Sequence, residues 1–399
     1  MIFAIILLIL GLLLLGFGAN YLITSSVRIA KHFHVSSLLI GLTIIAIGTS
    51  APELFLSGLA AIQGNGALSV GNVIGSNIFN LGFILGLSAI IMPIFIKKKI
   101  IYRDGLVLLI ITAAVLAMLW DQHVARREGA ILLAGLVGYN GYLRIKKDAP
   151  TDEEVEISKP KLKNLAYVAL GLVALASVHA TTIDGNFTVS FGMSLYSGIF
   201  LGILGLSFLV AIFKKDIPEF HDIGNGTLMN IIKLIASLGI LVLASELVVS
   251  AAVYIAQTFG ISERAIGATI VAAGTSLPEV AATVAAILKK NYDMGVGNVI
   301  GSDIFNILGI IGISSVIAPL NLTSKCVVLT QCDTGFWQLL FRDNIFSVLI
   351  LFLTLGITFL FMRTGWKLSK REGIILFVFA LLRMIFEINP NFFTKWFGG

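Results

Sequence analysis

Two glutamates, Glu53 and Glu279, lie inside long apolar segments of this 399-residue chain. Each ends a nearly identical hexapeptide, which reads GTSAPE at residues 48–53 and GTSLPE at residues 274–279. An ionised carboxylate is costly in an apolar segment, and in a membrane protein it usually marks an ion or proton pathway. The two hexapeptides therefore predict a chemistry of cations.

A second pair of matched blocks keeps the same separation. Residues 71–80 read GNVIGSNIFN and residues 297–306 read GNVIGSDIFN, so nine of the ten positions agree. Both pairs are 226 positions apart, and each decapeptide begins 18 positions after its glutamate. Two matched blocks at one offset indicate a duplicated unit.

The hexapeptides concentrate oxygen atoms. Pro52 has no N–H, so the carbonyl of Gly48, four residues earlier, loses its helical partner, and Thr49 and Ser50 add hydroxyl groups. The second copy repeats this with Gly274, Thr275, Ser276, Pro278 and Glu279. Hard cations such as Ca²⁺ take six to eight oxygen ligands, and two facing glutamates would balance one divalent ion. A helix kinked by proline explains the Pro, Ser and Thr residues, but it does not explain two intramembrane glutamates without basic partners.

The decapeptides supply further polar groups. Ser76 and Asn80 are four residues apart, as are Ser302 and Asn306, so each pair shares one face of a helix and offers neutral oxygens suited to a monovalent ion. The spacing of Gly71, Gly75, Gly297 and Gly301 is typical of close helix packing. Asp303 replaces Asn77 of the first copy, and the sequence leaves open whether it contributes to the ion site or points away.

The composition places these motifs in a membrane. The chain is 57% hydrophobic and 13% charged, with a mean hydropathy of +0.97, and apolar runs of about 20 residues recur throughout. The net charge of +6 does not indicate a nucleic-acid partner, because the basic residues lie in short loops between apolar runs. Twelve spans are expected, at residues 2–23, 36–62, 68–94, 105–120, 129–144, 164–181, 190–213, 229–252, 265–288, 294–319, 345–362 and 373–388.

Loop charges predict the orientation and the fold class. With the N-terminus outside, 20 Lys and Arg residues lie inside and six lie outside. We expect an all-α polytopic membrane protein of two inverted five-helix repeats, a ten-helix core with an inserted pair of hydrophobic helices. The four spans that carry the motifs are long enough to be tilted or broken. The expected divisions are residues 1–145 (motif 41–80), residues 146–228 (a cytoplasmic linker and the inserted pair) and residues 229–390 (motif 267–306).

The paired blocks resemble the two alpha repeats of the calcium/cation antiporter superfamily, and most closely those of prokaryotic sodium/calcium exchangers. The resemblance implies that Glu53 and Glu279 are the central Ca²⁺ ligands, shared with Na⁺, and that the spans at 2–23 and 229–252 slide past the rest. It also implies Ca²⁺ ligation by the carbonyls of Thr49 and Thr275, Na⁺ sites lined by Ser50, Ser76, Ser276, Ser302 and the carbonyls of Ala46 and Ala272, and a middle position completed by Asn80 and Asn306. Some relatives carry Asp at the position of Asn306. The sequence leaves open whether Asp303 partly replaces that aspartate here.

The function that we expect is an antiporter of the plasma membrane that exports Ca²⁺ in exchange for Na⁺. The alternative is exchange of protons for Ca²⁺ or another divalent cation at the same glutamates. A potassium-dependent exchanger, a passive channel and an intramembrane enzyme fit the sequence less well, the last because no His lies near Ser50 or Ser276. We expect no cofactor and no obligatory protein partner beyond the ions and the lipid bilayer. Cys326 and Cys332 share one outer loop, either as a disulfide or as two free thiols.

Overall fold

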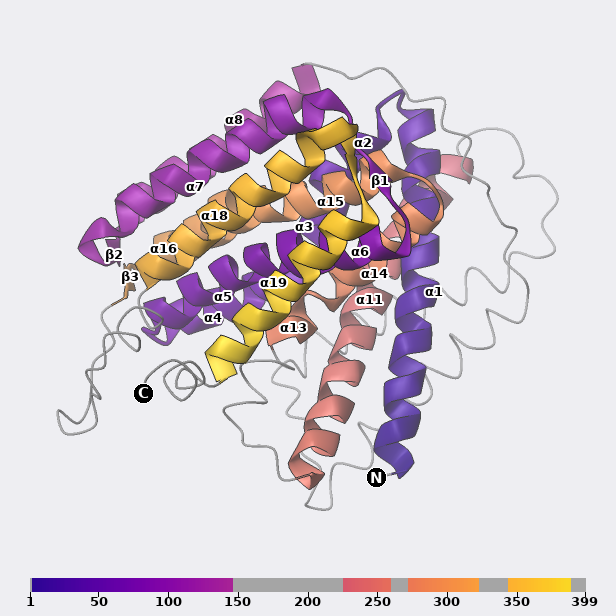
Figure 1. The fold of residues 1–399 in the computed structure, drawn as a ribbon, viewed down its shortest axis with the longest axis horizontal. Helices are drawn as coiled ribbons and strands as arrows, with labels where there is room; N and C mark the ends of the chain where they lie inside the picture. Colours follow the sequence, from indigo (N-terminus) through magenta and orange to yellow (C-terminus); the bar gives the residue numbers. More distant parts are fainter. Residues whose placement is uncertain (1, 146–224, 260–271, 323–343, 389–399) are drawn as a thin grey trace.

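A computed structural model describes residues 2–145, 225–259, 272–322 and 344–388. The described chain is almost entirely helical (Figure 1). The first repeat-bearing part contains α1 (Ile2–His32), α2 (Ser37–Ile40), η1 (Gly41–Ile45), α3 (Ala46–Thr49), α4 (Ala51–Ile62), α5 (Gly66–Ile78), η2 (Phe79–Ile84), α6 (Leu85–Ile91), η3 (Ile100–Gly105), α7 (Leu106–Met118), η4 (Leu119–Asp121) and α8 (Arg126–Ile145). The second contains α11 (Asn225–Thr258), α13 (Ala272–Thr275), α14 (Leu277–Leu288), α15 (Tyr292–Phe305), η7 (Asn306–Ile311), α16 (Gly312–Ile317), α18 (Asn344–Arg363), η9 (Thr364–Trp366) and α19 (Lys370–Ile388).

Two short antiparallel ladders tie loops of the two parts together. Strand β1 (Ile94–Phe95) pairs with β4 (Lys367–Leu368), and β2 (His123–Val124) pairs with β3 (Leu320–Asn321). Each ladder therefore joins residues more than 190 positions apart. Acidic residues cap α8 and α19: Glu128 accepts the N–H of Ala125, and Glu372 accepts that of Ser369, both at 2.7 Å.

Six described helices are long and apolar enough to cross a membrane, and a bent pair raises the number to seven. They cover Ile2–His32, Gly66–Ile91, Ile100–Asp121, Met229–Thr258, Tyr292–Ile317 and Ser347–Trp366, with Ser37–Thr49 and Ala51–Ile62 as the bent pair. α8 and α19 form at the predicted spans 129–144 and 373–388, although they are not among the six. The predicted spans 164–181 and 190–213 lie outside the described residues, as does the start of 265–288, so the total of twelve stays a prediction.

The expected breaks occur in two of the four motif-bearing spans. The chain bends by 49° between Thr49 and Ala51, and α13 and α14 are likewise separated at Ser276. The other two motif-bearing spans, Gly66–Ile91 and Tyr292–Ile317, run on as single helices, which leaves tilting as the predicted alternative for them. Each of these helices contains a π-helical stretch. η2 starts at Phe79 and includes the predicted ligand Asn80, and η7 starts at the predicted ligand Asn306.

The helices pack as two apolar bodies. α1 and α11 lie side by side along one flank (Figure 1) and share a cluster of buried residues that includes Leu22 and Leu241. A larger cluster joins α5, α6, α7, α15, α18 and α19. The α1–α11 pair meets this larger body partly through the small residues Ala282 and Ala286 of α14. This part of the contact is therefore apolar.

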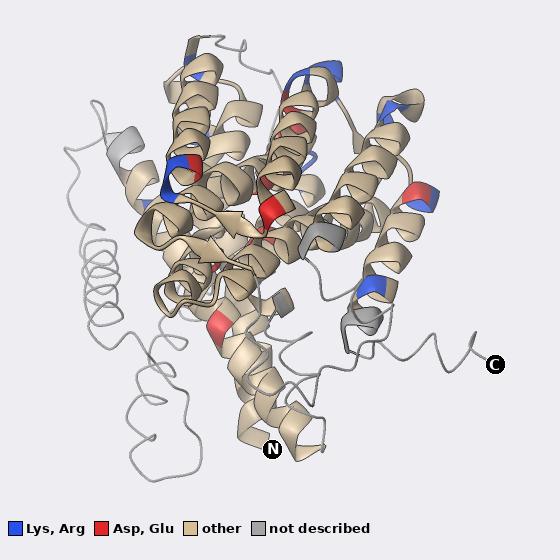
Figure 2. Ribbon diagram, turned by 90° about the vertical axis from the view of Figure 1, so that its left-hand side faces the viewer, with Lys and Arg blue, Asp and Glu red and all other residues tan. Residues whose placement is uncertain are grey.

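Charged residues are unevenly distributed over the described helices. Lys and Arg lie mainly near helix ends, whereas Asp and Glu also occur along the middle of the bundle (Figure 2). Two buried carboxylates have basic partners: Asp104 accepts from Arg103 at 2.8 Å and Asp293 from Lys97 at 2.5 Å. Neither Glu53 nor Glu279 forms an ion pair with any residue that the structure describes.

Candidate ion-binding site

The two helix breaks place Glu53 and Glu279 in matching positions. Ser50 and Ser276 precede α4 and α14 with similar non-helical backbone angles, φ −84° and ψ 13° against φ −91° and ψ 7°. Proline follows in the first turn of each helix, where its missing N–H costs nothing. The glutamate comes next, and both glutamates are fully buried. Local sequence thus directs two carboxylates inward at the N-termini of two helices.

The serine of each hexapeptide forms a hydrogen bond with the glutamate of the other hexapeptide. Ser276 donates to Glu53 Oε1 at 2.8 Å, and Ser50 donates to Glu279 Oε1 at 2.8 Å. Each glutamate is therefore held by the serine of the other hexapeptide. Ser76 Oγ lies 3.0 Å from Ser276 Oγ and 3.4 Å from Glu53 Oε1, so α5 joins the same cluster.

An amide network continues from this cluster. Asn306 Nδ2 lies 3.4 Å from Ser76 Oγ and donates to Asn77 Oδ1 at 2.9 Å. Asn80 donates to Asp303 Oδ1 at 2.9 Å, and Asn77 donates to the Asp303 carbonyl at 3.1 Å. Asp303 is fully buried and points toward Asn80. The structure thus brings its carboxylate to the polar network instead of directing it away.

The remaining predicted ligands lie along the same breaks. Ser302 Oγ is 3.5 Å from the carbonyl of Ala46, the first residue of α3. The Thr49 hydroxyl is directed back to the Ile45 carbonyl at 3.1 Å. In the second copy, Ala272 and Thr275 are the first and last residues of α13. The serines and asparagines therefore meet through side chains, and the Ala46 carbonyl faces Ser302.

Five buried oxygens of this cluster have no hydrogen-bond partner within the described chain. They are Glu53 Oε2, Glu279 Oε2, Asp303 Oδ2, Asn80 Oδ1 and Asn306 Oδ1. Burying such acceptors without a donor or a cation costs several kcal/mol in total, at about 1–3 kcal/mol each. Over the same residues, no group of three or more His, Cys, Asp or Glu side chains is close enough to hold a metal. The chemistry available is coordination of a hard cation by two carboxylates together with neutral oxygens.

Two asparagines that the sequence did not single out support the site. Asn72 donates to Ser57 at 2.9 Å, and Asn298 donates to Thr283 at 3.0 Å, so each fastens a motif helix to the next one. Asn298 also accepts from the Thr49 hydroxyl at 3.3 Å and links the two copies. Both are the second residue of the repeated decapeptide, and that repetition was the available signal.

The second-copy glycines pack closely, as predicted. A Cβ on Gly301 would lie 2.6 Å from the Cα and carbonyl oxygen of Leu42, and one on Gly297 would lie 3.0 Å from the Leu38 carbonyl oxygen. These contacts bring α15 directly against α2 and η1, and with it Ser302 toward Ala46. A Cβ on Gly75 would meet no described atom within 4 Å, and position 268, the equivalent of Leu42 in the second copy, lies outside the described residues, so close packing of Gly71 and Gly75 stays a prediction.

The carbonyls expected to lose their helical partners differ between the copies. Gly274 accepts a hydrogen bond from the Ser245 hydroxyl of α11. In the first copy the residue equivalent to Ser245, 226 positions earlier, is Ala19, which has no hydroxyl. Helix α11 is therefore tied directly to the second break.

Comparisons with known proteins agree with this geometry. The family described as sodium/calcium exchanger protein matches residues 3–143 and 229–388. The chain is 33% identical over 319 residues to the putative antiporter CaxA of Alkalimonas amylolytica, covering 80% of this chain and 82% of that protein. It is 29% identical to the sodium/calcium exchanger MaX1 of Methanosarcina acetivorans over 96% of this chain and 98% of that one.

Solved structures lead to the same family. One structure of the sodium–calcium exchanger NCX_Mj, soaked with Na⁺ and Sr²⁺, superposes with a TM-score of 0.67 at 26% identity. The superposition covers 96% of this chain and 98% of that one. The apolar helices and the matched length make this chain a multi-pass membrane protein. It belongs to the sodium/calcium exchanger family of the calcium/cation antiporter superfamily.

Proposed function

We propose that this protein is an antiporter that exports Ca²⁺ in exchange for Na⁺ by alternating access, at one central site formed by Glu53 and Glu279. The observation that carries the proposal is the crossed pairing of Ser50 with Glu279 and Ser276 with Glu53. Each glutamate uses one oxygen in this pairing and has its second oxygen buried without a donor among the described residues. Two such oxygens suit one divalent cation or several monovalent ones.

The ligands divide by charge and chemistry. Two carboxylates neutralise one Ca²⁺, and neutral oxygens complete its shell and serve Na⁺. We assign Ca²⁺ to Glu53 and Glu279 with the carbonyls of Thr49 and Thr275. We assign the flanking Na⁺ positions to Ser50, Ser76, Ser276, Ser302 and the carbonyls of Ala46 and Ala272, and the middle position to Asn80, Asn306 and Asp303.

Shared ligands couple the two fluxes. If both ions need Glu53 and Glu279, Na⁺ and Ca²⁺ compete, and the protein carries one or the other in each half-cycle. A ligand shifts a conformational equilibrium only by its differential affinity for the two states. Occupancy of this site therefore has to decide which access state the protein adopts.

The architecture proposed for this cycle is two inverted five-helix repeats, with α1 and α11 as the equivalent first helices. We place the protein in the plasma membrane with its N-terminus outside, residues 146–228 holding the linker and the inserted pair. The separate apolar cluster of α1 and α11 and the alanine surface of α14 support sliding of the pair past the remaining helices.

The alternative is a proton/Ca²⁺ exchanger in which the glutamates cycle protons. It rests on the same unpartnered oxygens, since a carboxylic acid would use one as its hydroxyl. The four serines around the glutamates favour Na⁺, because proton cycling does not require a shell of hydroxyl oxygens. A transporter of either kind agrees with the named relatives, which are exchangers and antiporters.

The deciding experiment measures ⁴⁵Ca²⁺ uptake into proteoliposomes loaded with Na⁺, with K⁺, or with an acidic interior. We expect uptake with Na⁺ loading alone. Uptake driven by the pH gradient alone would replace Na⁺ coupling with proton coupling. Uptake that needs only a Ca²⁺ gradient would mean a channel and would refute antiport.

Three matched variants test the site in the same assay. Glu53→Gln and Glu279→Gln each remove one charge and are expected to reduce uptake to the level of empty vesicles. Glu246→Gln is the control, because Glu246 lies within α11 and makes no hydrogen bond or ion pair with described residues. The control is expected to retain uptake, and uptake that survives either site variant would refute the assignment.

A further inference from the structure

A lysine outside the ion site connects α1 to the larger body. Lys289 directly follows α14, and its Nζ donates to the Asn20 carbonyl at 2.9 Å and to the Thr24 hydroxyl at 2.7 Å, both on α1. Thr24 also donates to the Asn20 carbonyl at 2.8 Å, so one turn of α1 receives the whole contact. The lysine is half-buried, and no acidic side chain pairs with it in the described structure.

This contact fixes an axial position of α1. The other described contacts between the α1–α11 pair and α14 are apolar, and Ser245 of α11 donates to the Gly274 carbonyl of α13, so Lys289 supplies the polar contact that positions α1 along α14. One helical turn spans about 5.4 Å, far more than the tolerance of a hydrogen bond. Any slide of α1 by a sizeable part of a turn separates Lys289 from both acceptors.

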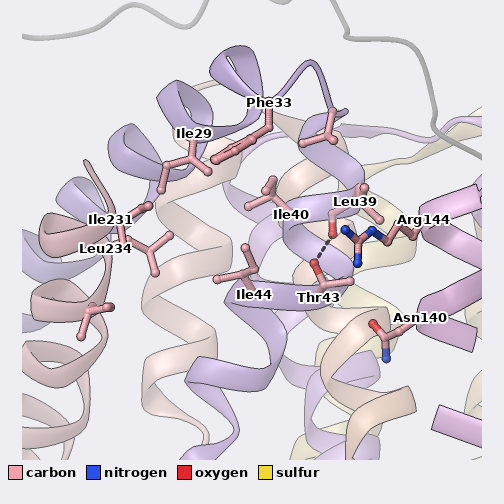
Figure 3. A pocket seen from close by; sticks show the side chains of 12 residues that line it. Ile29, Phe33, Leu39, Ile40, Thr43, Ile44, Asn140, Arg144, Ile231 and Leu234 are labelled. Carbon is pink, nitrogen blue, oxygen red and sulfur yellow. Dashed lines mark hydrogen bonds between the residues drawn. The ribbon is translucent and has the colours of Figure 1, made fainter. Parts of the chain in front are cut away.

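Space beside the pair allows such movement. A crevice of about 750 Å³ opens between the pair and the remaining helices (Figure 3). Ile29 of α1 and Phe33, which directly follows α1, line one side together with Ile231 of α11, and Thr43 and Arg144 lie on the other. The walls are mainly apolar, so the pair is not anchored to η1 and α8 along this side by polar contacts that the structure describes.

We infer that Lys289 is a positioning residue that latches α1 against α14 and must release before α1 slides. The inference rests on the proposed function, because it assumes that α1 moves during transport. The latch occurs only in the second copy of the repeat. The equivalent residue of the first copy, 226 positions before Lys289, is Gln63, which is exposed and uncharged. The two access states therefore differ in energy even without a bound ion.

The environment of the lysine determines how the latch responds to pH. Burial, followed by the charge of Arg28, lowers the pKa of Lys289 to about 8. The titratable groups on the elements packed against α14 are Tyr21, Arg28, Lys31 and His32 of α1, Lys233, Glu246 and Tyr254 of α11, and Tyr292, Asp293 and Asp303 of α15. Among them Arg28 is the one whose charge acts on Lys289, and Asp293 is paired with Lys97.

The sign follows from linkage. An ammonium group released into water returns toward its ordinary pKa of 10.5, so the released state binds the proton more tightly than the latched state. Raising the pH above about 8 therefore favours the latched state, while below about 8 both states are protonated and pH has no effect. Because the site is half-exposed, we expect a shift of about three- to tenfold between pH 8 and 9.5.

The test compares pH profiles of Na⁺-driven ⁴⁵Ca²⁺ flux. We expect the flux of the unmodified protein to fall about three- to tenfold from pH 8 to 9.5. Lys289→Gln and Lys289→Arg cannot lose a proton in this range and should abolish the fall, whereas the exposed neighbour in Lys290→Gln should leave it intact. A fall that persists in Lys289→Gln overturns the latch.

A second measurement does not depend on transport. Spin labels at the exposed positions Leu13 of α1 and Val137 of α8 report the separation of the two bodies, in a chain whose two cysteines are replaced by serine. We expect the population of the displaced distance to shrink from pH 8 to 9.5, and to be independent of pH in Lys289→Gln. A Lys289-dependent shift without Na⁺-driven flux would sink the proposed function and keep the latch. Flux with no such shift would sink the latch and keep the function.

Discussion

The close approach of α15 to η1 gives a prediction whose size follows from the structure. In Gly301→Ala the new Cβ would lie 2.6 Å from backbone atoms of Leu42, whereas ordinary contacts of this kind are 3.4–4 Å. Backbone cannot rotate away, so the two helices must separate by roughly 1 Å, and overpacking of this kind costs about 1–3 kcal/mol. Alanine also gains up to about 1 kcal/mol of helix propensity over glycine, which partly hides this cost.

A matched substitution removes that ambiguity. Gly138→Ala in α8 gains the same propensity, but its Cβ would meet no atom within 4 Å. We expect the midpoint of thermal unfolding in detergent, followed by tryptophan fluorescence, to be about 2–8 °C lower for Gly301→Ala than for Gly138→Ala. Ca²⁺ flux should also fall for Gly301→Ala, because Ser302 moves away from the Ala46 carbonyl. Equal midpoints would show that the backbones do not touch as described.

Two further predictions concern buried carboxylates. Asp303→Asn should raise the Na⁺ concentration for half-saturation of Ca²⁺ flux about tenfold while changing the apparent Ca²⁺ affinity less. The Asp303 carboxylate accepts from Asn80 and not from the serines that hold the glutamates. A Na⁺ titration with unchanged half-saturation would refute this role. Lys97→Met should destabilise the protein by about 1–2 kcal/mol, since it leaves Asp293, 2% exposed, without its partner. Adding Asp293→Asn should restore most of that loss of thermal stability, and a double variant no more stable than the single one would contradict the argument.

The helix breaks show what local sequence determines. Proline in the first turn, a polar residue before it and an apolar run after it act through backbone geometry within a few residues. The two hexapeptides therefore have almost the same angles at Ser50 and Ser276, although they lie 226 positions apart. The membrane class and the presence of two buried glutamates follow from composition and repetition in the same way. Gly66–Ile91 runs on without a break, because glycine permits a kink without imposing one.

The partners of these residues were decided by tertiary structure. No pattern within one hexapeptide indicates that Ser50 binds Glu279 rather than Glu53, because that choice depends on how two distant helices cross. Asp303 was ambiguous for the same reason, as one helical step decides between Asn80 and the opposite face. By sequence Lys289 is one of the 20 basic residues assigned to the inner side, and only the packing of α1 beside α14 gives it Asn20 as a partner. Local chemistry thus determined which groups are buried, and packing between the two copies determined which of them meet.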